Sequence, residues 1–361
     1  MEAPRPILIV AGGTGGHVFP GLAVACYLQE RGIPLLWLGT RRGLEARLVP
    51  QAGLRLLTIS VQGIREKGLK SYLLAPWQLL RALAQALHVL ARNRPGVVLG
   101  LGGFVTGPGA VAAWVMRIPL LIHEQNAIPG MTNKLLARIA TRVLEAFPQT
   151  FPRQRKAICT GNPVRAALCE LPPPHTRLLT DPRQRIRVLV LGGSQGARAL
   201  NRVVPQALAL LEGEKLAIRH QSGVADQETT ENSYTAYRLD AEVRSFFEDM
   251  QEAYAWADLV ICRAGALTLS ELTATGIGAI LIPFPYAVDD HQSANARHLV
   301  AAGAAMVVPE RDLSAAGLAE LLGDLFAHRM RLITMAERAR SLARPEATRA
   351  VAEQCMELTR D

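Results

Sequence analysis

The sequence uses one local arrangement twice: a short apolar run, a glycine-rich turn and a helical pattern. Residues 7–11 lead into Gly12-Gly13-Thr14-Gly15-Gly16, and residues 188–191 lead into Gly192-Gly193-Ser194-Gln195-Gly196. A glycine turn that opens a helix presents backbone N–H groups, and the helix dipole favours an anion beside them. A tight turn without a ligand is the alternative, but two equivalent copies favour two related domains that each bind phosphate.

Apolar runs alternate with helical patterns along the whole chain. The runs expected as buried strands are residues 7–11, 35–38, 97–99, 120–122, 188–191, 259–262 and 279–282. The patterns expected as helices are residues 19–30, 77–92, 131–139, 200–211, 267–275 and 293–302. This alternation is typical of parallel sheets covered by helices. We predict an α/β fold with two Rossmann-like, doubly wound parallel-sheet domains that face each other across a cleft, joined by a proline-rich linker at 169–185.

Several protein classes are excluded or disfavoured. The dinucleotide fingerprint needs a third glycine where Val18 stands, and the second loop already fails at Ser194, so NAD-dependent chemistry is a weak alternative. A P-loop ATPase is excluded because no Gly-Lys-Ser/Thr occurs. The five scattered cysteines indicate reduced thiols, without a disulfide frame or a zinc site. No window offers the ~20 apolar residues of a membrane span, and no secretory signal is expected at the N-terminus.

Basic residues concentrate in one part of the chain. Residues 65–142 hold ten lysines and arginines, opposed only by Glu66 and Glu124. Neither interleaved aromatics nor a known module indicates nucleic acid, so an anionic membrane or a phosphate-bearing substrate fits this charge better. The pattern at 77–92 is amphipathic, which usually means packing on a sheet. We nevertheless hypothesise a peripheral membrane contact, formed by Leu73, Leu74, Trp77, Trp114, Lys134 and Arg138.

Six motifs carry a resemblance to one family. They are residues 12–20, His123-Glu124-Gln125-Asn126, Gly161-Asn162-Pro163-Val164-Arg165, Gly192-Gly193-Ser194-Gln195-Gly196-Ala197, residues 263–271, and Asp290-His291-Gln292. In their order and spacing, over essentially the whole chain, they resemble the MurG family of N-acetylglucosaminyltransferases, which complete lipid II in bacterial peptidoglycan synthesis.

The resemblance implies a GT-B fold, UDP-GlcNAc as donor and lipid I (undecaprenyl-diphosphate-MurNAc-pentapeptide) as acceptor. The product linkage is then β-1,4, formed with inversion. Residues 1–164, rejoined by a C-terminal helix at 345–361, become the acceptor and membrane side, and residues 165–344 become the donor domain. The resemblance also implies a peripheral location on the cytoplasmic face of the bacterial cell membrane, and it leaves open partners among cell-wall or division proteins.

The resemblance further implies a set of donor-binding residues. Glu271 matches the carboxylate that accepts hydrogen bonds from the ribose hydroxyls. The alternative is that Glu271 has no ligand and is simply an acidic residue in the first turn of a helix, where the helix dipole favours it. Arg165 and Ser194 are expected to contact phosphate, with a surface charge at the domain border as the alternative for Arg165. Asn126 and Gln292 are expected to read sugar hydroxyls, because an amide both donates and accepts. The remaining expected contacts are Thr14, Gly15, Gly16, Phe247, Ala266, Leu267, Thr268, Leu269 and Ser270.

The chain departs from the family at two positions. Gly276-Ile277-Gly278 stands where relatives more usually carry proline, and Phe247 stands where they often have an aliphatic residue. A contact of Phe247 with the nucleobase would therefore run through its backbone or through altered packing.

An inverting transfer needs a base for the acceptor hydroxyl and stabilisation of the leaving diphosphate. Helix N-termini and Arg165 can stabilise UDP without a metal, and no Asp-x-Asp motif is present, so neither a metal nor a cofactor is expected. His17 is the leading base, because a helix N-terminus lowers the pKa of an imidazole and keeps it neutral. A histidine that orients or binds the acceptor phosphate is the alternative role, and Glu124 is the alternative base.

Two alternative functions are also consistent with these motifs. Another GT-B enzyme, such as a UDP-GlcNAc 2-epimerase or a glycolipid glycosyltransferase, would share the loops, although an epimerase needs no lipid-docking surface. A non-catalytic nucleotide-sugar-binding protein would share the fold but has no need of His17, Asn126, Arg165 and Glu271 together.

Overall fold

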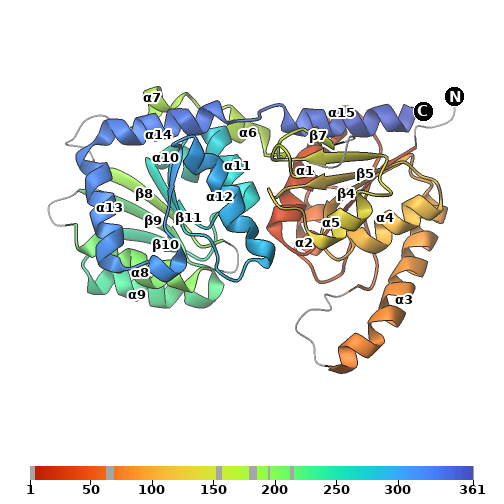
Figure 1. Ribbon diagram of the computed structural model, residues 1–361, viewed down its shortest axis with the longest axis horizontal. Coiled ribbons are helices and arrows are strands. Elements are labelled where there is room, and N and C mark those ends of the chain that lie inside the picture. Colours follow the sequence, from red (N-terminus) through yellow and green to blue (C-terminus); the bar gives the residue numbers. More distant parts are fainter. Residues whose placement is uncertain are drawn as a thin grey trace. The chain divides into compact units, whose positions relative to one another are not determined.

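The chain forms two compact units. The computed structural model describes residues 5–61, 69–151, 157–178, 185–193, 196–211 and 215–360. The first unit comprises Met1–Arg165 and Glu346–Asp361, and the second comprises Ala166–Pro345. Each unit is a parallel sheet with helices on both faces, as the alternating pattern predicts (Figure 1).

The sheet of the first unit has seven strands in the order β3-β2-β1-β4-β5-β6-β7. They are β1 (Ile7–Ala11), β2 (Leu35–Gly39), β3 (Leu56–Thr58), β4 (Val97–Gly102), β5 (Leu120–Glu124), β6 (Arg142–Glu145) and β7 (Ala157–Cys159). The strand order reverses between β1 and β4, and all adjacent strands are parallel. In open α/β sheets, ligands bind at such a switch point, beyond the carboxyl ends of the strands.

Helices cover both faces of this sheet. They are α1 (Gly15–Gln29), α2 (Glu45–Gln51), α3 (Leu69–Asn93), α4 (Thr106–Val115), α5 (Met131–Leu136) and α15 (Ala347–Arg360). Alternate residues of β1 point to opposite faces: Leu8 and Val10 pack with α3 and α4, while Ile7 and Ile9 pack with α1 and α15. The C-terminal helix α15 therefore completes the core of the first unit.

The second unit repeats the plan with six parallel strands in the order β10-β9-β8-β11-β12-β13. They are β8 (Ile186–Leu191), β9 (Leu216–Gln221), β10 (Ala241–Arg244), β11 (Leu259–Cys262), β12 (Gly278–Leu281) and β13 (Ala305–Val307). Its α-helices are α6 (Ala166–Cys169), α7 (Pro174–Arg177), α8 (Arg198–Ala209), α9 (Gln227–Ala236), α10 (Met250–Trp256), α11 (Ala266–Thr275), α12 (His291–Ala301), α13 (Ala315–Ala327) and α14 (Arg329–Ser341). Short 3-10 turns are Val224–Asp226, Val288–Asp290 and Glu310–Asp312.

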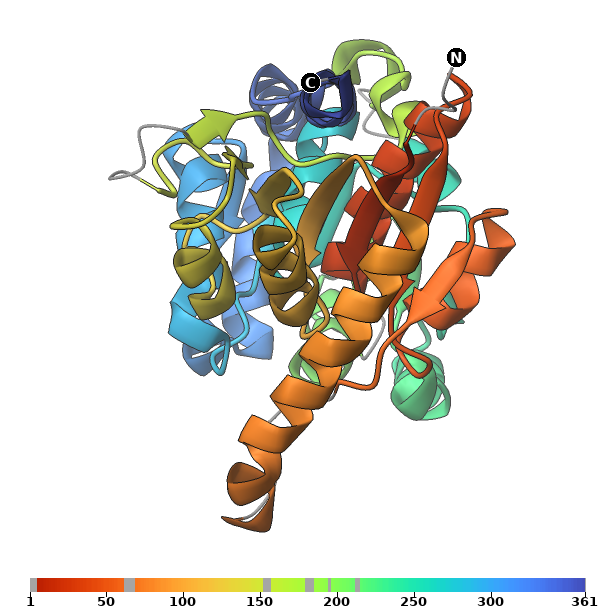
Figure 2. The same cartoon turned by 90° about the vertical axis from the view of Figure 1, so that its right-hand side faces the viewer.

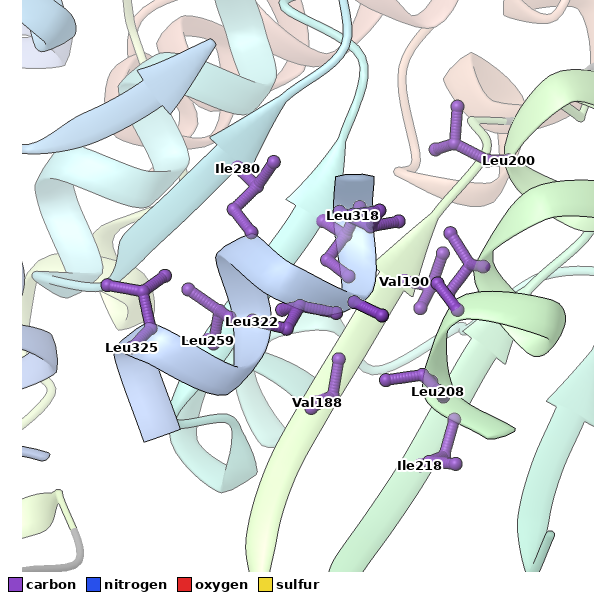
Figure 3. Close-up of a cluster of buried hydrophobic side chains, with 14 of the residues drawn as sticks. Val188, Val190, Leu200, Leu208, Ile218, Leu259, Ile280, Leu318, Leu322 and Leu325 are labelled. Carbon is purple, nitrogen blue, oxygen red and sulfur yellow. The ribbon is translucent and has the colours of Figure 1, made fainter. Parts of the chain in front are cut away.

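The core of the second unit is built from β-branched and leucine side chains. Figure 3 shows Val188 and Val190 of β8 between Leu208 of α8 and Leu322 of α13. Burying such a side chain stabilises the fold by about 1.5–3 kcal/mol. Because both faces of the sheet are covered, each position of these strands can be apolar and contribute in this way. The continuous apolar runs that indicate strands in the sequence are the consequence of helices on both faces.

The expected proline-rich linker is only partly a linker. Cys169 ends α6, and residues 174–177 within the linker form α7, which begins with Pro174 in the first turn, where a missing N–H has no cost. Arg340 donates to the carbonyl oxygens of Cys169 at 2.7 Å and Leu171 at 3.3 Å, so this segment belongs to the second unit. A proline in this segment, Pro174, therefore begins a helix and does not simply interrupt regular structure.

Candidate functional site

The first glycine loop connects β1 to α1 at the switch point of the first sheet. Gly13 has a φ of +91°, and Thr14 precedes the helix in an extended conformation without a capping side-chain hydrogen bond. The N–H groups of His17 and Val18 bond to the Thr14 carbonyl at 3.1 and 3.2 Å. The amides before them, on Gly15 and on Gly16, belong to the first turn, whose donors a helix leaves for a ligand.

His17 lies in this first turn and rests on the end of β4. Its Nδ1 is 3.4 Å from the Thr14 hydroxyl. An added Cβ on Gly102, whose φ is +113°, would lie 2.5 Å from the imidazole Cδ2. Only a glycine permits this contact, so Gly102 fixes the height of the imidazole above the sheet. The structure thus brings together two glycine turns that are far apart in the sequence.

Glu124 ends β5 with only 2% of its surface exposed, and its carboxylate is saturated with donors. Oε1 accepts from the backbone and side-chain amides of Asn126 at 3.0 and 3.1 Å. Oε2 accepts from the Gly130 amide at 3.1 Å and from Asn133 Nδ2 at 2.8 Å. These four donors tie the Glu124 carboxylate to Asn126, Gly130 and Asn133.

Two buried polar neighbours of Glu124 were not expected as site residues. His123 points its Nε2 to the Gly161 carbonyl at 2.9 Å, and burial lowers the pKa of this imidazole. Asn133 joins α5 to the end of β5. A polar run at the end of an apolar strand is the sequence signal for His123, whereas Asn133 stands in a helical pattern with no motif to mark it.

The second glycine loop connects β8 to α8 in the same position of the second sheet. The Gly192 amide donates to the Gln221 carbonyl at 2.9 Å, which ties the loop to β9. Gly193 and Gly196 have φ values of +79° and +77°. Ser194, an expected phosphate contact, lies outside the described residues.

Beneath this loop lies a buried hydrogen-bond network that the sequence did not indicate, and Asn201 Nδ2 joins it to Asp226 Oδ2 at 3.2 Å. His220 Nε2 is 3.0 Å from Asn201 Oδ1, and its Nδ1 is 2.9 Å from the Tyr234 hydroxyl. Asn201 Nδ2 donates to the Ser222 carbonyl at 2.9 Å. His220 has no exposed surface, and burial lowers its pKa to about 3, so the imidazole is neutral.

Helix α11 begins at a third glycine turn, after β11. Ala266, Leu267 and Thr268 form its first turn, while Leu269 is buried and donates its N–H to the Gly265 carbonyl at 3.0 Å. The Ser270 hydroxyl bonds to the Ala266 carbonyl at 2.9 Å. Among the expected residues 266–270, the first three therefore have the backbone N–H groups that are most available to a ligand.

Glu271 lies on the same helix and is nearly buried. The Tyr254 hydroxyl donates to its Oε2 at 3.0 Å, so a neighbouring helix orients the carboxylate. At the opposite end of α11, Arg177 donates to the carbonyl oxygens of Thr275 at 2.7 Å and Gly276 at 3.0 Å. Cations at a helix C-terminus stabilise the helix dipole.

Three other expected residues differ in how they are held. Gln292 Oε1 accepts the Phe284 amide at 2.9 Å and ties α12 to the preceding loop, in which Asp289 and Asp290 adopt positive φ. Phe247 is buried, and its amide donates to Gln221 Oε1 at 3.0 Å, so its ring belongs to the core. Arg165 is half-buried and ends the first unit, directly after the buried Val164.

The expected membrane residues lie on helices that contact one another. Trp77 of α3 is 70% exposed and Trp114 of α4 is 54% exposed, and Lys134 and Arg138 are exposed at and after α5. Helix α4 contacts both α3 and α5, and α3 extends beyond its own sheet (Figures 1 and 2). The side chains of Leu73 and Leu74 lie outside the described residues. Additional exposed apolar residues, absent from the expected set, are Leu79, Leu80, Val115, Met131 and Leu135.

No helix in the described part of the chain is long and apolar enough to cross a membrane. Within the same residues, no cluster of histidine, cysteine, aspartate or glutamate could hold a metal ion.

Known proteins match the chain over nearly its full length. Models of the glycosyltransferase family 28 N-terminal and C-terminal domains match residues 7–145 and 187–353. A relative from Methylococcus capsulatus, named UDP-N-acetylglucosamine--N-acetylmuramyl-(pentapeptide) pyrophosphoryl-undecaprenol N-acetylglucosamine transferase, is 55% identical over 98% of each chain. A crystal structure of Acinetobacter baumannii MurG has a TM-score of 0.83 at 39% identity, and the match covers 98% of this chain and 100% of that one.

Two doubly wound units, each with a glycine loop at its switch point, define a glycosyltransferase fold of the GT-B class. The chain belongs to glycosyltransferase family 28, and the resemblance of its motifs to the MurG family is confirmed. The fold alone is less specific. The UDP-GlcNAc 2-epimerase from Neisseria meningitidis shares it at 13% identity, with a TM-score of 0.69 over 98% of this chain and 100% of that one.

Proposed function

We propose that this protein transfers N-acetylglucosamine from UDP-GlcNAc to the C4 hydroxyl of the N-acetylmuramic acid in lipid I, and so forms lipid II. The observation that carries the proposal is 55% identity, over 98% of each chain, to a transferase of that name. The acceptor oxygen attacks the anomeric carbon of the donor sugar while the bond to the diphosphate breaks, so that UDP leaves and the configuration inverts.

The donor is assigned to residues 165–344. Glu271 accepts hydrogen bonds from the ribose hydroxyls, and the first-turn amides of α11 hold the diphosphate. Arg165, the last residue of the first unit, keeps its proposed phosphate contact. The orientation of Glu271 by Tyr254 supports the role of α11, as do Arg177 and Arg340, which donate to the carbonyl oxygens of Thr275 and Ala274 at the far end of the helix.

The acceptor is assigned to residues 1–164 together with 345–361. We assign its diphosphate to the first-turn amides of α1, so that Gly15 and Gly16 serve the acceptor in place of the donor contact expected from the resemblance, and His17 takes the proton of the C4 hydroxyl. The position of His17 in the first turn, above the carboxyl ends of β1 and β4, supports this assignment. Glu124 then acts by holding Asn126 in place.

Release of UDP from UDP-GlcNAc, with and without a soluble lipid I analogue, tests the function. We expect release to depend on the acceptor and the product to carry a β-1,4 linkage. An epimerase would convert UDP-GlcNAc without an acceptor, and a binding protein would release nothing, so either result would reject the transferase.

The exposed residues of α3, α4 and α5 are proposed to meet the cytoplasmic face of the bacterial membrane peripherally. Trp77, Leu80 and Trp114 provide apolar contact, and Lys134 and Arg138 attract anionic headgroups. Such a surface brings the enzyme to a substrate that is itself anchored in lipid.

Flotation with liposomes tests this surface. We expect binding to vesicles that contain anionic lipid, reduced by salt, and a further loss of about five-fold for each of Lys134→Gln and Arg138→Gln. Tyr286→Ser, at an exposed aromatic residue of the second unit, serves as the control. Binding that ignores lipid charge and salt would reject this surface.

A further inference from the structure

Glu45 is a fully buried carboxylate that no step of the proposed reaction uses. It is the first residue of α2, yet its side chain has no exposed surface. Burying a carboxylate is strongly unfavourable unless hydrogen bonds replace its hydration, so its surroundings have to supply several donors.

Three neutral donors surround this carboxylate, and one of them belongs to the first glycine loop. The Gly13 amide donates to Oε2 at 2.9 Å. The Thr40 amide and hydroxyl donate to Oε1 at 2.9 and 2.7 Å. The Thr40 hydroxyl in turn accepts the Gly43 amide at 3.1 Å. All three groups act on the carboxylate as donors, so an amide side chain cannot satisfy the same set.

Backbone without side chains encloses the Glu45 carboxylate. An added Cβ on Gly12 would lie 2.6 Å from Oε1, and one on Gly43 would overlap the carboxylate as well. The space therefore admits this carboxylate and nothing larger. The absence of a side chain on Gly12 in the first loop therefore makes room for the Glu45 carboxylate on the core side of the loop, while a ligand can bind on the other side.

The bond to Gly13 determines which way the loop amides point. Gly13 has a φ of +91°, and its N–H is directed inward to a residue 32 positions away in the sequence. Beyond it, α1 begins at Gly15 without a capping side chain. With the Gly13 amide held inward, the next amides are the ones left to a ligand at the helix N-terminus.

We propose that Glu45 is a positioning residue for the acceptor: it anchors the first glycine loop from beneath, so that the first-turn amides of α1 and the imidazole of His17 face the acceptor diphosphate and hydroxyl. This inference depends on the proposed acceptor role of the first unit.

The test is Glu45→Gln in the full-length protein, which keeps the shape of the side chain and replaces one acceptor oxygen by a donor. We expect kcat/KM for a lipid I analogue to fall about ten- to a hundred-fold, because the backbone amide of Gly13 loses the charged acceptor that holds it. The Kd for UDP-GlcNAc should stay within two-fold of the unmodified protein. Glu30→Gln, at an exposed carboxylate of the same unit, is the matched control and should change neither value.

Each outcome separates the inference from the function on which it depends. If Glu45→Gln leaves acceptor kcat/KM within two-fold, even with a lower melting temperature, Glu45 has no positioning role. If both Glu45→Gln and His17→Ala weaken UDP-GlcNAc binding instead, the acceptor assignment of the loop is wrong. Should Glu45→Gln fail to fold, Thr40→Val removes the hydroxyl that donates to Glu45 Oε1 and accepts the Gly43 amide, and it keeps the Thr40 amide donor. It should lower acceptor kcat/KM about two- to ten-fold, and no change would overturn the inference.

Discussion

The two glycine loops each connect a buried strand to a helix but are held by different chemistry. Beneath the first loop, the carboxylate of Glu45 accepts the Gly13 amide directly. Beneath the second loop, the Gly192 amide bonds to a main-chain carbonyl, and the neighbouring turn is held by the neutral pair Asn201 and His220. One loop thus bonds directly to a single carboxylate, and the other depends on main-chain bonds and on the side chains of Asn201 and His220.

This difference suggests how a duplicated fold can divide its work. A loop anchored by one carboxylate is sensitive to a single isosteric substitution, whereas a loop anchored by main-chain bonds spreads the same role over several residues. Four experiments test this difference and the proposed division of the substrates between the two units.

His17→Ala should give the largest effect. We expect kcat to fall about 10²–10⁴-fold, the usual contribution of a general base, while the Kd for UDP-GlcNAc stays unchanged. Rapid-quench or steady-state assays with saturating lipid I analogue measure kcat, and calorimetry measures donor binding. Near-normal turnover with an unchanged pH profile would remove His17 from the role of base.

Glu271→Gln should affect the donor side alone. The KM for UDP-GlcNAc should rise about ten- to a hundred-fold, because hydrogen bonds to a charged acceptor are replaced by weaker ones. Glu320→Gln, at an exposed position of α13, is the control in the same unit. A rise confined to the acceptor KM would contradict the division of substrates between the units.

Acid should destabilise the network under the second loop. The pKa of His220 is about 3 in the folded chain, against about 6.5 when the histidine is solvated, so the unfolded chain binds a proton that the folded chain excludes. Stability should therefore fall by about 1.4 kcal/mol for each unit of pH lowered between these two values.

His220→Gln should flatten this acid dependence. Melting temperatures measured between pH 7 and pH 4 would show a smaller decline in the variant, whereas His328→Gln, at an exposed histidine, should behave like the unmodified protein. Parallel declines in all three proteins would mean that His220 is not the titrating group.

Tyr254→Phe should give the smallest effect. It deletes one hydrogen bond to Glu271, so the KM for UDP-GlcNAc should rise about two- to ten-fold, less than for Glu271→Gln. Donor titrations in parallel with the two variants measure the order. An effect equal to that of Glu271→Gln would show that orientation of the carboxylate, rather than its charge, dominates.

Much of the fold could be predicted from local patterns. The apolar runs at β1, β8 and β11 are buried on both faces, and so their hydrophobicity is continuous and easily recognised. Strands such as β3 and β10 escaped prediction, because they lie at sheet edges, where one side is open and the pattern is mixed. Their pairing partners determine them more than their own residues do.

The candidate site divides in the same way. His17 and Glu271 could be selected because each stands beside a glycine turn in a motif. Glu45 and His220 could not, since Glu45 bonds to a residue 32 positions away and His220 to one 19 positions away. Asn133 bonds to Glu124 only nine positions away, but no motif marks it in the sequence.

The two doubly wound units, the glycine turns at their switch points and the family can all be recognised in the sequence, because strand burial and turn geometry are local properties. What lies beneath each turn follows from the tertiary structure. The Glu45 carboxylate supports the first loop, and a network around Asn201 and His220 supports the second, because a buried polar group needs a partner that another element supplies.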